Sequence, residues 1–154
     1  MFKKGQVSTE YLVILAVVLV VALVVVALVS GVTPVSSGVS ETQSKNYWQA
    51  ASPMTISAWK YTGTSTGTLD LTMENMDGQK VTITNIAMGG SNVYTTPNVS
   101  FSVGETKTIQ ITGMAACGTA GSSFELTNVS ITYSKGTITG LLQKGDKSIS
   151  GKCS

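Results

Sequence analysis

Residues 11–29 read YLVILAVVLVVALVVVALV, an apolar run of 19 residues without a charged side chain. A helix needs about 20 apolar residues to cross the hydrocarbon core of a bilayer, so this run is long enough to do so. Its β-branched residues would favour a strand in a soluble protein. In lipid, however, one segment must satisfy its own backbone hydrogen bonds, and a helix does this. The run therefore predicts a long apolar helix near the N-terminus.

The residues ahead of the run help to decide what kind of segment it is. A secretory signal has an apolar stretch of about 7 to 15 residues before its cleavage site, and this run is longer. A single-pass anchor fits the length, with Lys3 and Lys4 holding the N-terminus in the cytoplasm. A plain anchor has no use for Glu10, because a carboxylate at the start of an apolar run is costly to bury unless it is paired or hydrogen-bonded.

The stretch KKGQVSTEYLVIL, residues 3–15, resembles the class III signal peptide of archaeal type IV pilins. The resemblance is close at the N-terminus and extends to the rest of the chain only in general organisation. It implies that a membrane aspartic prepilin peptidase cuts between Gly5 and Gln6 and leaves the helix on the mature protein. The residues that carry it are Lys3, Lys4, Gly5, Gln6, Ser8, Glu10 and Leu15.

The resemblance also implies an assembly role for Gln6 and Glu10. Cleavage makes Gln6 the first residue and Glu10 the fifth, and it creates an amino group at Gln6. A carboxylate among apolar helices needs a cation, and the amino terminus of a neighbouring subunit supplies one. The alternative is that Glu10 stays hydrated among lipid headgroups. Loss of residues 1–5 also leaves eight Lys beside eight acidic side chains, so that subunits can stack without strong repulsion.

Residues 30–53 continue toward a second region. Helical spacing of Val32, Val35 and Val39 predicts one helix from about residue 7 to residue 50, bent near Gly31–Pro34 because proline removes a helical hydrogen bond. Pro53 ends it. The alternative is a membrane helix, a linker over residues 30–38 and a separate short helix over residues 40–51.

Residues 54–154 read as short alternating runs between turn residues, which predicts an immunoglobulin-like β-sandwich of seven or eight strands. The fold class is therefore α+β. Asp77-Gly78 predicts a hairpin turn between the run at 69–73 and the strand that contains Val81. Apolar positions change phase between Phe124 and Tyr133, which predicts a bulge near Thr127 or Asn128.

Cysteines and sequons suit an exported chain. An even number of cysteines predicts a disulfide between Cys117 and Cys153, with two unrelated buried thiols as the alternative. Asn98-Val99-Ser100 and Asn128-Val129-Ser130 match the N-glycosylation pattern, and in both the alternation turns the Asn toward solvent.

The composition argues against most chemistry. The chain has no His and no Arg, which removes the commonest general base and the bidentate phosphate contact. Its Lys residues form no run that could follow a nucleic-acid backbone. Two Cys without His cannot fill a four-ligand zinc site unless carboxylates or a second chain help. We therefore expect no enzymatic activity, no catalytic residues, no metal, no cofactor and no nucleic-acid partner.

With these features, the resemblance to archaeal type IV pilins implies a structural subunit of an archaeal type IV adhesive pilus, a glycoprotein found outside the cell and held in the membrane by a single helix before assembly. The predicted domains are a leader at 1–5, the helix at 6–53 and the β-sandwich head at 54–154. The expected partners are identical subunits in a helical filament, the prepilin peptidase and the pilus assembly machinery. The alternatives are a membrane-anchored extracellular binding module and an archaeal flagellum subunit.

Overall fold

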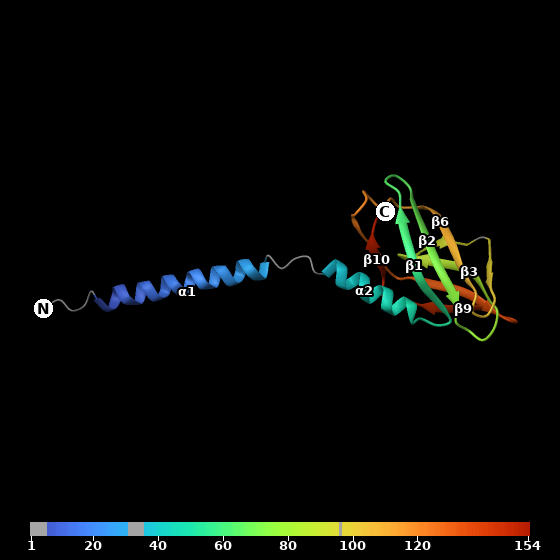
Figure 1. Ribbon diagram of the computed structural model, residues 1–154, viewed down its shortest axis with the longest axis horizontal. Helices are drawn as coiled ribbons and strands as arrows, with labels where there is room; N and C mark the ends of the chain where they lie inside the picture. Colours follow the sequence, from blue (N-terminus) through green and yellow to red (C-terminus); the bar gives the residue numbers. More distant parts are fainter. Residues whose placement is uncertain (1–5, 31–35, 96) are drawn as a thin grey trace. The chain divides into compact units, whose positions relative to one another are not determined.

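The computed structural model describes residues 6–30, 36–95 and 97–154 (Figure 1). The chain divides into two units, Met1–Ser36 and Ser37–Ser154, which are taken separately below. The second unit therefore contains residues 37–53 as well as the strands, the first of which begins at Met54.

The first unit contains the helix α1, Gln6–Ser30. Every side chain from Thr9 to Val26 is exposed within the chain. A helix that is apolar all round has no polar face to present to water, so it belongs among other apolar groups. The predicted N-terminal apolar helix is thus confirmed. Whether a helix continues through Pro34 concerns residues outside the described ranges.

The second unit contains the helix α2, Ser36–Gln49, except for its first residue, and α2 packs onto the strands that follow. Trp48 is fully buried and Ser44 nearly so. Ser44 Oγ donates to the Ser148 carbonyl oxygen at 2.6 Å, and the Tyr47 hydroxyl accepts from the Asp146 N–H at 2.9 Å. The contacts of α2 therefore make it part of the head.

Ten strands lie in the described part of the second unit and form three antiparallel sheets. The first has the order β1-β2-β6, the second has the order β4-β3-β8-β9 with β5 also pairing with β3, and the third is β10-β7. Figure 1 shows them with α2 lying alongside. The bounds are β1 Met54–Thr62, β2 Gly67–Asn75, β3 Val81–Met88, β4 Ser91–Tyr94, β5 Val99–Phe101, β6 Thr106–Met114, β7 Ser123–Leu126, β8 Ser130–Lys135, β9 Ile138–Lys144 and β10 Ile149–Lys152.

The α+β class, with a long helix followed by antiparallel sheets, is confirmed, whereas the number of strands exceeds the seven or eight predicted. Four strands have only three or four residues: β4, β5, β7 and β10. Such runs are too short to show a two-residue alternation.

One apolar cluster joins the sheets and α2. Alternate residues of β2 are buried along its whole length, as the alternation predicted. The largest fully buried side chains are Trp48, Phe101, Met54, Ile56, Leu69, Leu71, Met73, Ile83, Ile86, Ile111, Ile131 and Ile149.

Two local predictions were wrong, and both fail at a change of sheet. Asp77-Gly78 makes no hairpin, because β2 and β3 belong to different sheets and the turn crosses between them. The phase change after Leu126 is no bulge in a paired strand. There the chain leaves the pair β10-β7 for the second sheet, and Asn128 takes a left-handed conformation with φ of 50°. Alternation gives the side-chain direction within one strand but cannot reveal that the next strand lies in another sheet.

Candidate processing and assembly site

The predicted cleavage point coincides with the start of α1. Gln6 is the first of the described residues and lies in α1, while Gly5 lies outside them. Cutting between them leaves the whole of α1 on the mature chain. The predicted position of the scissile bond is therefore compatible with a helix that survives processing.

Glu10 lies on α1 one turn after Gln6, and its side chain is exposed. It is the one charged residue between residues 6 and 30. When lipid or other apolar helices surround α1, this carboxylate loses its water and needs a cation or hydrogen-bond donors. The geometry leaves Glu10 accessible to a partner outside its own chain.

The apolar surface of α1 is exposed from Tyr11 to Val26. Exposed fractions of its large side chains range from 65% at Tyr11 to 48% at Leu15. Covering apolar surface is favourable by about 25 cal/mol per Å², so the helix gains stability wherever it finds an apolar environment. By length and composition, Thr9–Val26 is able to cross a membrane. A bilayer and a bundle of like helices both provide such an environment.

Cys117 and Cys153 form the predicted disulfide, with their Cα atoms 5.8 Å apart. The bond attaches the end of β10 to the loop that follows β6. Among the described strands β10 pairs with the four residues of β7 alone, and so short a two-stranded pair is marginal by itself. Because Ser44 bonds the Ser148 carbonyl and accepts from the Ser150 N–H, the disulfide secures the segment on which α2 docks.

The two predicted glycosylation residues are both exposed, as the alternation indicated. Asn98 precedes the short edge strand β5. Asn128 lies in the connection from β7 to β8. Occupancy by sugar stays a prediction for each.

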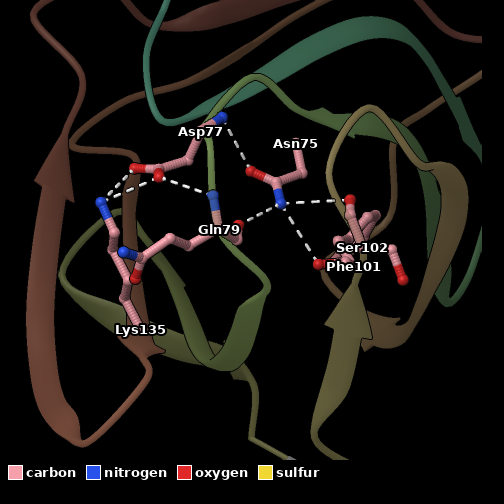
Figure 2. A network of polar contacts seen from close by, with 6 residues as sticks. All are labelled: Asn75, Asp77, Gln79, Phe101, Ser102 and Lys135. Carbon is pink, nitrogen blue, oxygen red and sulfur yellow. Dashed lines mark hydrogen bonds and ion pairs between the residues drawn. The ribbon is translucent and has the colours of Figure 1, made fainter.

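A buried polar network at the turn after β2 was not predicted from the sequence (Figure 2). Asn75 is fully buried, and its Nδ2 donates to the carbonyl oxygens of Gln79 at 2.8 Å, Phe101 at 3.2 Å and Ser102 at 3.1 Å. Its Oδ1 accepts from the Asp77 N–H at 2.9 Å. A single amide thus joins the turn to the β5–β6 loop. The Asn-x-Asp spacing at 75–77 is the only signal that could have suggested it.

Asp77 extends this network to β8. Lys135 Nζ lies 2.8 Å from each Asp77 carboxylate oxygen, and this contact holds the pKa of Asp77 below its usual value. At the next turn, the Ser102 N–H donates to the Glu105 carboxylate. That bond, helped by Lys107, lowers the pKa of Glu105. Asp77 thus links the turn after β2 to β8, and Glu105 closes the turn between β5 and β6.

A polar groove of about 390 Å³ runs between α2 and the loops beside β7 and β10. Ser148 Oγ donates to Glu125 at its rim. Among the described residues, no group of three or more His, Cys, Asp or Glu side chains is placed to hold a metal ion. The lining residues are Ser40, Gln43, Ser44, Glu125, Thr127, Asn128, Gly145, Asp146, Lys147 and Ser148.

Comparison with known families matches residues 3–30 to the class III signal peptide. The match covers the Gly5–Gln6 bond, Glu10 and α1, so the chain carries this signal peptide together with its apolar helix. A class III signal peptide implies processing by a prepilin peptidase and use of an assembly machinery, and it fits a membrane-anchored precursor of the type IV pilin or archaeal flagellin type. No curated protein matches the chain.

Proposed function

We propose that this chain is the precursor of a structural subunit of an archaeal type IV adhesive pilus, without enzymatic activity. One observation carries the proposal: the match to a class III signal peptide over residues 3–30 falls on a helix whose side chains from Thr9 to Val26 are all exposed. The same helix can lie in the membrane before assembly and against the helices of other subunits afterwards. The head of sheets and α2 then lies outside the cell.

Glu10 and Gln6 direct the association in this proposal. After cleavage, the new amino group of Gln6 is a cation at the end of α1, and the Glu10 carboxylate of a neighbouring subunit is its partner. An apolar surrounding strengthens their attraction, whereas leaving either charge alone there is costly. The pair therefore favours one register of neighbouring helices over others.

The first experiment is intact mass spectrometry of material sheared from the cell surface. A chain that begins at Gln6 in filaments supports the proposal. A chain that begins at Met1 and stays in membranes contradicts it and leaves the anchored binding module.

Two glutamate variants test the assembly role. Glu10→Gln keeps the shape and removes the charge, so we expect normal cleavage at Gly5–Gln6 and at least a tenfold loss of filaments. Glu74→Gln removes a carboxylate from the head and is the matched control, with filament yield unchanged. Equal yields from both variants would exclude a charge pair at Glu10.

A flagellum subunit would carry the same signal peptide, so a measurement on cells must distinguish a pilus subunit from a flagellum subunit. Cells that lack this chain should keep swimming and lose attachment to surfaces. Loss of swimming with attachment intact would favour the flagellum subunit instead. The residues around Glu10, which resemble adhesive pilins, favour the pilus.

A further inference from the structure

We propose that Asn98, and not Asn128, is the residue of the folded chain that takes an N-linked glycan. This inference rests on the export that the proposed function requires. In the transfer, Asn Nδ2 bonds to the anomeric carbon of an oligosaccharide, and the bond from that carbon to a lipid phosphate carrier breaks. The phosphate carrier and the amide proton leave. The acceptor Asn and the two residues after it must therefore reach an enzyme site together.

The segment at Asn98 meets this requirement with little disturbance of the fold. Asn98 is exposed and lies outside any strand, immediately before β5. β5 has three residues and pairs on one edge only, with β3. On its other edge, Lys107 Nζ bonds the Ser100 carbonyl oxygen at 2.6 Å, and a long lysine side chain is easily displaced. A groove of about 390 Å³ is lined by Pro97 and Val99, the residues on either side of the acceptor in the chain.

The hydroxyl that the sequon needs is also within reach. Ser100 Oγ makes its side-chain hydrogen bond with Thr82 Oγ1 at 2.8 Å. A threonine on the neighbouring strand is its partner there, on a half-exposed face of the sheet. Releasing this bond, the Lys107 contact and the pairing of β5 with β3 presents residues 98–100 in extended form, and the Val99 side chain that moves with them is only half-buried.

The segment at Asn128 is held on both sides. Val129 is fully buried, and its carbonyl oxygen accepts from the Gly145 N–H at 2.9 Å. Ser130 begins β8, which is an interior strand: it pairs with Ala87 of β3 and with Lys144 of β9. An enzyme would have to extract a core side chain and open two strand pairings to reach this sequon.

The backbone conformation at position 128 explains why the residue there is Asn, and no glycan is needed for the explanation. Its φ is 50°, a left-handed conformation that Asn adopts several-fold more readily than most residues other than Gly. The conformation occurs where the chain passes from one sheet to another. We therefore assign Asn128 to the turn and Asn98 to the glycan.

Trypsin separates the two sequons, because Lys80, Lys107 and Lys135 place Asn98 in peptide 81–107 and Asn128 in peptide 108–135. Protein sheared from the native cells is reduced, digested and analysed by mass spectrometry. We expect the glycan mass on 81–107 alone. A glycan on 108–135, or on neither peptide, overturns the inference. The intact mass of the same sample shows whether the chain starts at Gln6, so failure here is distinct from failure of the proposed function.

Variants connect the glycan to the fold. Asn98→Gln should lose the glycan mass, whereas Ser100→Thr keeps the sequon and should keep the mass. Asn128→Gly preserves the left-handed backbone and should keep both the glycan and the Tm. Asn128→Gln should keep the glycan while lowering the Tm, because Gln is less tolerant of positive φ. Loss of glycan in Asn128→Gly would assign the sugar to Asn128.

Discussion

Trp48 of α2 lies so close to Gly145, in the turn between β9 and β10, that a Cβ atom at position 145 would be 2.3 Å from Cη2 and Cζ2 of the ring. Trp48 is fully buried, so the ring lies among the core side chains and not in solvent. The contact explains why the turn has a glycine there, and it ties α2 to the second sheet.

Gly145→Ala should therefore loosen the docking of α2. Forcing extra atoms into a packed core costs about 1 to 3 kcal/mol, and we expect this loss in the free energy of unfolding measured with urea. Gly78→Ala is the matched control, because a Cβ there meets nothing within 4 Å. Equal stability of the two variants would show that Trp48 can shift without cost.

Asn75→Asp should destabilise the head strongly. The change replaces an amide that donates to three carbonyl oxygens by a group that, when ionised, only accepts. A buried charge without a partner costs about 3 to 5 kcal/mol. An ionised carboxylate at position 75 repels the three carbonyl oxygens around it, and protonation relieves this repulsion. The deficit in unfolding free energy should therefore grow as pH rises above the ordinary Asp pKa of about 3.9. Asn46→Asp, on the exposed side of α2, should change little; a deficit independent of pH would contradict the explanation.

Asp77 should make the stability of the head depend on acid. Lys135 lowers the pKa of Asp77 in the folded chain, so the unfolded chain binds a proton more readily. The stabilisation is complete above the unfolded pKa of about 3.9 and is lost as pH falls through the lower folded value. Wild type should therefore lose more stability than Asp77→Asn in that range, measured by Tm against pH. Parallel curves would mean that the ion pair does not survive in solution.

Replacing both cysteines by serine should cost about 4 kcal/mol, since the disulfide closes a loop with a sequence separation of 36. The loss should extend to α2, whose hydrogen bonds end on the segment that the disulfide secures. Hydrogen exchange in wild type with and without reductant measures this. Faster exchange confined to β7 and β10, with α2 still protected, would separate the helix from the disulfide.

Much of this architecture could be predicted from local pattern. An apolar run of 19 residues can hardly be anything but a helix, and strict alternation along β2 predicted its buried face. An even number of cysteines behind a class III signal peptide indicated the pairing of Cys117 with Cys153.

Connections between sheets could not be predicted in this way. Asp77-Gly78 has the composition of a hairpin turn, but the pairing partners of β2 are β1 and β6. Asn75 occupies one of the alternating buried positions of β2, where an apolar side chain is expected. The reason for a polar side chain there is the contact with the carbonyl oxygens of Phe101 and Ser102. Those oxygens come from 26 and 27 residues away, a separation that periodicity within one strand does not encode.

The bond between Cys117 and Cys153 also limits how far the head can stretch. The residues between the two cysteines form a closed covalent ring. If tension along a filament reaches the head through α2, the disulfide carries the force past this ring, and the residues inside the ring are not pulled apart. The sequence separation of the two cysteines is 36, so a segment of that length cannot be stretched while the bond is intact. Fully extended, such a segment would span about 120 Å. A head that unfolds under force would therefore lengthen only by the residues outside the ring. Reduction of the disulfide would allow the residues inside the ring to extend as well.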